Sequence, residues 1–369
     1  MLKQKKYFKI MMTGGGTGGH MFPLIAVARE LEEISYTAGF QIRFILVGPE
    51  MKKDISREDH FIYRHLITGK LRRYLSFKTI LDIFKTIIGF IQAFYYMLLY
   101  KPDIIFSKGG YGSFPTVVIG WLFRIPVISH ESDSVPGAAN RLLSIFSKKI
   151  IVSFPGEYDS LPNKKIEYIG NPMRQMDKGI KSDALKEFSL IPDKPTLLII
   201  GGSQGSHQIN MLVQDILPEL TDKYQIIHQV GKNKLPELDK EFKNYHMYEF
   251  LNENGMKNAY AAADLVISRA GAGSIFEIAM TGKPSILIPL KHDPSNHQKE
   301  NAKRYAEAGA CIVLDPRKVL PRTLLENIND LMNNQDKRDK MSKAAKAFAK
   351  PDAAKKIAEF ILNYSGYEK

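Results

Sequence analysis

A short apolar run that leads into a glycine-rich loop and then a helical pattern opens each half of this 369-residue chain. Ile10–Thr13 leads into the loop GGGTGGH, and Leu197–Ile200 leads into GGSQGS. Apolar runs and helical patterns alternate through both halves, a pattern typical of βαβ units with parallel sheets. We therefore expect an α/β protein with two Rossmann-like domains that divide near Asn171.

The predicted N-terminal domain spans residues 1–171, and the predicted C-terminal domain spans 172–349. The tail from Gln335 to Lys369 is rich in Lys and Ala and has apolar residues at helical spacing, which predicts helix. We expect its last part, about 350–369, to pack back on the N-terminal domain.

The charge balance favours an anionic partner, such as nucleic acid, a phosphorylated substrate or anionic lipid. Lys and Arg number 52 against 39 Asp and Glu, a net charge of +13, and residues 1–170 hold 23 of the basic and 14 of the acidic side chains. Nucleic acid is disfavoured because the chain has no recognisable RNA- or DNA-binding module. The single cysteine, Cys311, cannot form an intramolecular disulfide, which favours a reducing cytoplasm.

Residues 71–100 form the most apolar segment of the chain. Asp82, Lys85 and Gln92 interrupt it, which argues against a membrane-spanning helix. Residues 70–101 carry six basic side chains and one acidic one, interleaved with Tyr74, Phe77, Phe84 and Phe90. This mixture suits a surface that binds an anionic bilayer, and the alternative is a long core helix with a solvated basic face.

The first glycine loop, Gly14–Gly19, matches G-x-G-x-x-G between a strand and a helix, a setting that binds diphosphates. A dinucleotide enzyme also needs an acidic residue about 20 positions further on, but the second strand reaches its first acid only at Glu50. This counts against NAD. His20 follows the loop at a helix N-terminus, which keeps an imidazole neutral, so it is a candidate general base or else a capping or packing residue.

Further glycine loops follow predicted strands at Gly109–Ser113 and Gly201–Ser206. The stretch Arg269–Glu277 follows another strand and opens a helix, where Glu277 either complements the helix dipole or accepts both hydroxyls of a ribose. A metal site at His292, Asp293 and His297 is disfavoured because the spacing is irregular. Gln298 and Asn301 suit hydrogen bonding to a sugar.

These motifs, in this order and spacing, resemble the MurG family of glycosyltransferase family 28. The family transfers N-acetylglucosamine (GlcNAc) from UDP-GlcNAc to the lipid-linked muramoyl-peptide, lipid I, and so makes lipid II. The resemblance covers residues 10 to about 315 and rests on the segments GGGTGGHMFPLIAVARELEE, SKGGYGSFP, SHESDSVPGAANR, IGNPMRQ, GGSQGSHQIN, HQVGK and SRAGAGSIFEIAMTGKPSILIPL.

The resemblance implies a GT-B fold, whose two parallel sheets face each other across a cleft. The C-terminal domain would bind UDP-GlcNAc, and the N-terminal domain would bind lipid I and face the membrane. Transfer would invert the anomeric centre in one displacement with no metal and no cofactor. The implied partners are the two substrates, anionic lipids at about 70–101 and cell-wall synthesis proteins, at the cytoplasmic face of the cell membrane.

Carried over motif by motif, the resemblance implies that Glu277 binds the ribose and that Gln298 binds the GlcNAc hydroxyls. It makes His20 the candidate base, with Glu131 or Asp133 as second choice. Many family members have HEQN where this chain has HESD, and an ionised Asp133 accepts hydrogen bonds but donates none. The substrate-binding residues implied in this way are Thr17, Gly18, Gly19, Asp133, Arg174, Ser203, Gln204, Leu251, Ala272, Gly273, Ser274, Ile275, Glu277 and Gln298.

The chemistry of the reaction agrees with these assignments. Departing UDP gains negative charge, which helix N-termini and Arg174 can stabilise where other enzymes use a divalent ion. The alternatives are a UDP-GlcNAc epimerase or another lipid glycosyltransferase on this fold, a dinucleotide-dependent oxidoreductase, and a basic nucleic-acid-binding protein.

Overall fold

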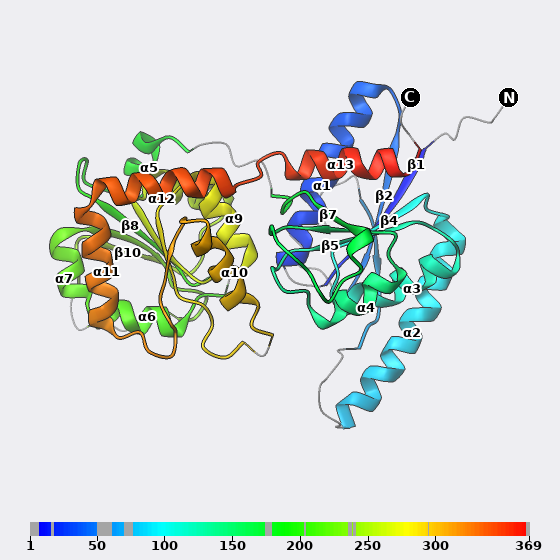
Figure 1. Ribbon diagram of the computed structural model, residues 1–369, viewed down its shortest axis with the longest axis horizontal. Coiled ribbons are helices and arrows are strands. Elements are labelled where there is room, and N and C mark those ends of the chain that lie inside the picture. The colour runs from blue at the N-terminus through cyan, green and yellow to red at the C-terminus, as the bar shows by residue number, and fades with distance from the viewer. Residues whose placement is uncertain are drawn as a thin grey trace. The chain divides into compact units, whose positions relative to one another are not determined.

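The computed structural model describes residues 7–15, 18–49, 61–69, 77–173, 179–202, 204–234, 238, 241–293 and 295–366, without the side chains of 18–20 and 77–79. The chain divides into two compact units. Unit 1 comprises Met1–Gln175 with Pro351–Lys369, and unit 2 comprises Met176–Lys350. Both units are α/β with parallel strands, which confirms the predicted fold class (Figure 1).

Unit 1 has a parallel sheet that, over its described residues, has seven strands in the order β3-β2-β1-β4-β5-β6-β7. The strands are β1 (Phe8–Thr13), β2 (Ile42–Gly48), β3 (Phe61–His65), β4 (Ile104–Ser107), β5 (Val127–Glu131), β6 (Lys149–Val152) and β7 (Ile166–Tyr168). The α-helices are α1 (Gly18–Ala38), α2 (Phe77–Tyr100), α3 (Phe114–Leu122), α4 (Ala138–Phe146) and α13 (Ala353–Tyr364).

The two faces of this sheet are covered by different helices because successive side chains of a strand point to opposite sides. In β1, Ile10 and Met12 pack in one cluster with residues of α1 and α13. Met11 packs in a second cluster with residues of α2, α3 and α4. The last helix of the chain thereby belongs to unit 1, and Ile357 and Ile361 are fully buried there.

Unit 2 has a parallel sheet of six strands over its described residues, in the order β10-β9-β8-β11-β12-β13. The strands are β8 (Thr196–Ile200), β9 (Gln225–Gln229), β10 (Tyr245–Tyr248), β11 (Leu265–Ser268), β12 (Ser285–Leu287) and β13 (Ile312–Val313). The helices are α5 (Lys181–Glu187), α6 (His207–Gln214), α7 (Leu217–Lys223), α8 (Glu253–Ala262), α9 (Ala272–Thr281), α10 (His297–Glu307), α11 (Pro321–Asn333) and α12 (Gln335–Phe348).

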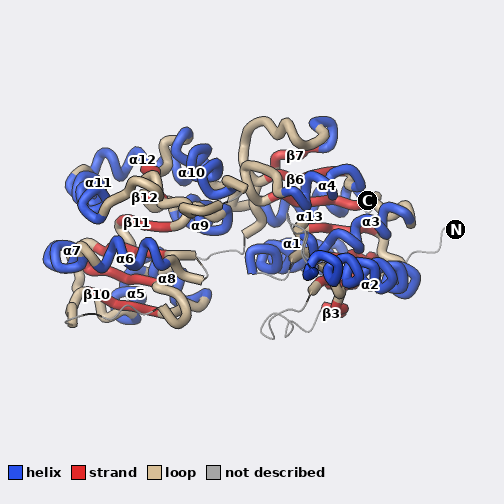
Figure 2. Tube along the Cα trace, turned by 90° about the horizontal axis from the view of Figure 1, so that it is seen from below, coloured by secondary structure: helices blue, strands red, loops and turns tan. Residues whose placement is uncertain are grey.

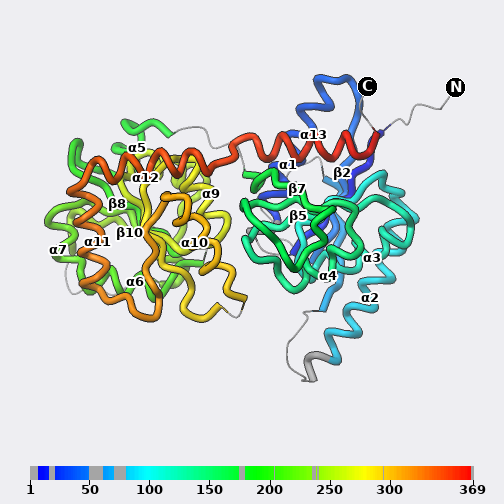
Figure 3. Tube along the Cα trace, in the orientation of Figure 1, coloured from blue at the N-terminus to red at the C-terminus, as the bar shows by residue number. Residues whose placement is uncertain are grey.

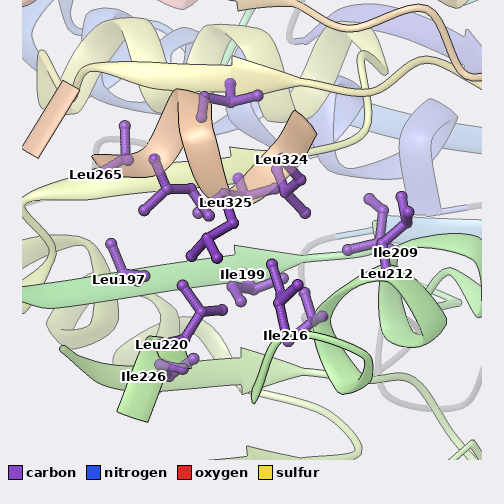
Figure 4. Close-up of a cluster of buried hydrophobic side chains, with 14 of the residues drawn as sticks. Leu197, Ile199, Ile209, Leu212, Ile216, Leu220, Ile226, Leu265, Leu324 and Leu325 are labelled. Atoms are coloured by element: carbon purple, nitrogen blue, oxygen red, sulfur yellow. The ribbon is translucent and has the colours of Figure 1, made fainter. Parts of the chain in front are cut away.

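Apolar side chains of α6, α7 and α11 cover one face of the unit 2 sheet, as the close-up in Figure 4 shows. Leu197 and Ile199 of β8 point into this cluster, together with Leu324 of α11. Figure 2 shows the strands of each unit with helices on either side. Both sheets therefore leave their strand ends, rather than their faces, for a ligand.

Candidate functional site

Each sheet has one point at which the strand order reverses direction. In unit 1 it lies between β1 and β4, and in unit 2 it lies between β8 and β11. In open parallel sheets the loops at the carboxyl ends of such neighbouring strands separate and leave a crevice for a ligand. All four glycine-rich stretches singled out in the sequence follow these four strands.

In unit 2, the loop after β8 depends on glycine for its own geometry. Gly202 and Gly205 have φ of 86° and 70°, and a Cβ at Gly205 would overlap the carbonyl oxygen of Val230. Ser206 then caps α6, because its Oγ accepts the backbone N–H of Ile209 at 3.2 Å. Gln204 is exposed, and its carbonyl accepts Lys234 Nζ at 2.7 Å. Ser203, predicted at this loop, lies outside the described residues.

The fold gives no comparable reason for a glycine at the position that precedes α9. Gly271 is the N-cap residue with φ of −66°, which any residue can adopt, and a Cβ placed on it would meet no atom within 4 Å. Gly273, in the first turn, is equally open. A helix N-terminus presents backbone N–H groups that have no partner within the helix, and here two of the residues around them carry no side chain and face open space. This end of α9 is therefore suited to bind an anion.

Glu277 lies one helical turn beyond Gly273, on the same side of α9. Its Oε2 accepts a hydrogen bond from Tyr260 Oη of α8 at 3.2 Å. Burial raises the pKa of Glu277 to about 7, and the Tyr260 hydrogen bond lowers it by a smaller amount. A carboxylate held beside an anion-binding helix end can accept two hydroxyls of a bound sugar ring.

Leu251 and Gln298 both form hydrogen bonds with other residues of unit 2. The N–H of Leu251, one of the predicted substrate-binding residues, donates to Gln229 Oε1 at 3.1 Å. Gln298 Oε1 accepts the N–H of Leu290 at 3.2 Å, and its own N–H donates to Asp293 Oδ2 at 3.0 Å. Gln298 is thus tied to the loop after β12.

A hollow of about 620 Å³ is lined by the loops after β12 and β13 and by the start of α10, the helix that also holds Gln298. His292 and Asp293 are among its walls, and Asp293 caps the start of α10 through the N–H groups of Ser295 and Gln298. Within the described ranges, no three His, Cys, Asp or Glu side chains are close enough to hold a metal ion.

In unit 1, the glycines after β4 serve packing. Gly109 and Gly110 have φ of 79° and 80°, and a Cβ at Gly109 would overlap the Asn140 side chain. Asn140 Oδ1 accepts the N–H of Gly110 at 3.3 Å, and Asn140 Nδ2 donates to Glu131 Oε2 at 2.8 Å. The loop after β1 includes Thr17, outside the described residues, while α1 begins at Gly18 and includes Gly19 and His20, whose side chain is not described.

Glu131, the second choice as base, holds the loop that follows it. Its Oε1 accepts the N–H of Asp133 at 3.0 Å, and its Oε2 accepts the N–H of Gly137 at 3.1 Å. Burial and then the charge of Asp133 raise the pKa of Glu131. These contacts favour a positioning role for Glu131. Asp133 is half-buried and follows it on the same loop.

Two buried residues in unit 1 were not predicted from the sequence. Lys108, directly after β4, has Nζ 2.7 Å from His130 Nδ1 and also donates to Ser132 Oγ. Burial lowers the pKa of Lys108 to about 8, and the charges of Glu131 and Asp133 raise it by less. His130 Nε2 lies 3.1 Å from the carbonyl oxygen of Gly170. Since burial and Lys108 lower the pKa of His130 well below its usual range, it is neutral.

Two doubly wound parallel units, each with glycine loops at its switch point, are the architecture of GT-B enzymes. The model of the glycosyltransferase family 28 N-terminal domain matches residues 10–152, and that of the family 28 C-terminal domain matches 196–357. The chain belongs to glycosyltransferase family 28.

Its relatives include the UDP-N-acetylglucosamine–N-acetylmuramyl-(pentapeptide) pyrophosphoryl-undecaprenol N-acetylglucosamine transferases of Clostridium perfringens and Legionella pneumophila. The first is 39% identical over 90% of this chain and 92% of the relative, and the second is 38% identical over 91% and 92%. The crystal structure of Acinetobacter baumannii MurG is 26% identical, covers 96% of this chain and 99% of that one, and has a TM-score of 0.70. A UDP-GlcNAc 2-epimerase from Neisseria meningitidis, 16% identical, shares the fold with a TM-score of 0.70 over 96% of this chain and all of that one.

Proposed function

We propose that this enzyme transfers GlcNAc from UDP-GlcNAc to the C4 hydroxyl of the muramoyl residue of lipid I, giving lipid II and UDP in peptidoglycan synthesis. The names of its relatives support this substrate pair. The observation that carries the proposal is the open N-terminus of α9 at the switch point of unit 2, with Glu277 one turn further on. Phosphate at the helix end and ribose at Glu277 account for both features.

In the proposed reaction, the C4 oxygen of the acceptor attacks the anomeric carbon of GlcNAc as the bond to the β-phosphate oxygen of UDP breaks. The electron pair of that bond leaves with UDP, and the anomeric configuration inverts. The acceptor proton passes to a base, for which His20 is our candidate. The N–H groups at the start of α9 stabilise the charge that develops on the diphosphate, so we propose that no divalent ion is required.

We expect UDP release from UDP-GlcNAc to depend on a short-chain lipid I analogue and to persist in EDTA. His20→Ala should lower the rate at least ~100-fold while leaving UDP affinity unchanged, because it removes only the base. The measurement is UDP release by wild type and variant, with and without acceptor. Release at the same rate without acceptor would contradict transfer and favour epimerase-like chemistry, and loss of release on chelation would contradict the metal-free step.

We also propose that α2 docks the enzyme on the cytoplasmic face of an anionic membrane. Figures 1 and 3 show α2 extending outward from unit 1. Over Ile80–Tyr100, Lys85 is the one exposed charged residue. At 100° per residue, the exposed apolar side chains cover an arc of roughly 160° on the helix. They are Ile80, Leu81, Ile83, Phe84, Ile87, Ile88, Ile91, Phe94, Tyr95, Leu98 and Leu99.

The opposite face of α2 is fixed to the unit. Ala93 and Met97 are buried in its core, and a Cβ at Gly89 would overlap the carbonyl oxygen of Ile67. By length and composition Ile80–Tyr100 could cross a bilayer, but crossing would strip this packed face from unit 1. A helix with one apolar arc and one packed face is suited to lie in the plane of the membrane surface.

Replacing Phe84, Ile87 and Ile91 together with serine should weaken binding to phosphatidylglycerol vesicles about tenfold or more, because each loses apolar area that the bilayer would cover. These side chains are 60%, 50% and 66% exposed, so folding should not suffer. The matched control is serine at Ile180, Ile191 and Leu320, which are equally exposed apolar residues of unit 2. Vesicle cosedimentation measures both, and equal binding by the two variants would contradict docking through α2.

A further inference from the structure

The segments that follow β4 and β11 share a sequence pattern of Ser, cation, small residue, Gly, any residue, Gly and Ser. In unit 1 it is Ser107–Ser113, SKGGYGS, and in unit 2 it is Ser268–Ser274, SRAGAGS. The cation has the same backbone position in both segments. The N–H of Lys108 donates a hydrogen bond to the carbonyl oxygen of the last residue of β1, and the N–H of Arg269 donates one to the carbonyl oxygen of the last residue of β8. Each unit therefore has a cationic residue directly after a strand that borders its switch point.

Arg269 is buried, with 7% of its surface exposed. Its Nη1 donates to Gln208 Oε1 of α6 at 3.2 Å and to the carbonyl oxygens of Ile288 and Pro289 at 3.0 and 2.6 Å. Gln208 Nε2 in turn donates to the carbonyl of Pro316 at 2.6 Å. The guanidinium thus joins α6 to the ends of the loops after β12 and β13.

The two cations differ in their counter-charges. Lys108 has Glu131 and Asp133 close enough to raise its pKa. Arg269 forms no ion pair with any carboxylate of the described residues. The three oxygens that accept its hydrogen bonds belong to neutral groups, and its Nε has no hydrogen-bond partner among the described residues. Burial lowers the pKa of Arg269 to about 10, so it is charged at pH 7. A buried charge without a counter-charge is costly unless a ligand supplies one.

We propose that the buried guanidinium of Arg269 is the fixed counter-charge for the diphosphate of the donor. Its buried positive charge would then have a counter-charge only when a nucleoside diphosphate is bound. This rests on the proposed function, since it takes the crevice between β8 and β11 as the donor site. Arg269 acts through its field and through the loops it holds, so it is a positioning residue. Because its environment excludes water, its attraction for the diphosphate is stronger and less screened by salt than that of a surface cation.

Gln208 offers a test that changes the charge without removing the arginine. Gln208→Glu places a carboxylate against Arg269 Nη1 and balances the guanidinium internally, whereas Gln208→Met removes the same hydrogen bonds and adds no charge. The probes are UDP and uridine, which differ only in the diphosphate, and isothermal titration measures the affinity of each. The ratio of the two affinities isolates the diphosphate from any general damage to the site.

We expect Gln208→Glu to lower the UDP-to-uridine affinity ratio about tenfold or more relative to Gln208→Met. Arg269→Met should lower the ratio as well, and Arg269→Lys, which keeps the charge but not the fork of hydrogen bonds, should retain most of it. Uridine binding shows that each variant is folded. A wild-type ratio in Arg269→Met, or equal ratios in the two Gln208 variants, would overturn the proposal. Failure of wild type to bind UDP would instead overturn the proposed function.

Discussion

Replacing Glu277 with glutamine should weaken UDP binding about 100-fold and, at pH 8, make the ligand-free protein more stable. The loss of affinity follows because a carboxylate accepts two ribose hydroxyls as charge-assisted hydrogen bonds, each contributing about 1.5–3 kcal/mol, whereas an amide offers a single oxygen. Calorimetry with UDP measures it. Glu219→Gln, which removes an exposed carboxylate from the first turn of α7, is the matched control: it should leave UDP binding unchanged and should not stabilise the protein, because a carboxylate at a helix N-terminus is itself stabilising by up to about 1 kcal/mol.

The gain in stability follows from the raised pKa of Glu277. In the unfolded chain a glutamate titrates near 4.5, whereas in the folded protein its pKa is about 7. Between these values the folded state binds more protons than the unfolded state, so stability falls as pH rises from about 4.5 to 7. The loss is at most about 3 kcal/mol above pH 7. Glutamine has no such loss, so the variant should melt up to about 10 °C higher at pH 8, since about 1 kcal/mol moves the melting temperature of such a domain by about 2–4 °C.

Wild-type affinity should also depend on pH. Only the ionised carboxylate accepts both hydroxyls, so uridine, which carries no phosphate, should bind about tenfold more weakly at pH 6 than at pH 8. A 2′,3′-dideoxyuridine lacks both of these ribose hydroxyls and should show no such dependence. If both nucleosides respond equally to pH, or if Glu277→Gln binds UDP as wild type does, the assignment of the ribose to Glu277 is wrong.

The fold was predictable because its determinants are local. A buried parallel strand reads as an apolar run, and the loop and helix that follow it have their own signals, so both sheets and the helical tail followed from the sequence. The role of each glycine was not predictable. The loops look alike in the sequence, but Gly205 is required by the backbone of Val230 and Gly109 by the side chain of Asn140, while Gly271 meets nothing. Such neighbours are distant in the chain.

The buried polar partners were missed for the same reason. Arg269 contacts Gln208 across 61 positions of sequence, and Lys108 contacts His130 across 22. From the sequence alone, a Lys or Arg beside a glycine is expected to be exposed to solvent, and only the folded structure shows that these two are buried. In the segment 70–101 the sequence suggested Phe77, Phe84 and Phe90, interleaved with the basic residues, as side chains that contact a bilayer. Phe84 is 60% exposed, but Phe90 packs edge-on against Phe114 at 5.7 Å, and the Phe77 side chain lies outside the description. At 100° per residue, Phe90 lies about 120° around the helix from Phe84 and just outside the exposed arc, so its ring packs inward.

Alanine at Gly271 should weaken ligand binding and spare stability, whereas alanine at Gly205 should lower stability, although both residues belong to glycine motifs of the predicted donor site. Gly271→Ala should leave the free energy of unfolding within ~1 kcal/mol of wild type, because its φ is −66° and its Cβ would meet no atom. It should nevertheless weaken UDP binding about 100-fold, because the methyl group holds the diphosphate away from N–H donors that contribute about 1.5–3 kcal/mol each.

Gly205→Ala should instead cost about 2–5 kcal/mol of stability, because its φ of 70° strains an L-residue and its Cβ would overlap the Val230 carbonyl. Thermal melts and UDP titrations of both variants measure the contrast. Gly137→Ala is the control for a helix N-cap, since Gly137 precedes α4 with φ of −64° and ψ of 153°, close to the −66° and 144° of Gly271. That variant should bind UDP as wild type does. Normal UDP affinity in Gly271→Ala would mean that the open end of α9 does not receive the diphosphate, and the donor site would then have to be sought elsewhere in unit 2.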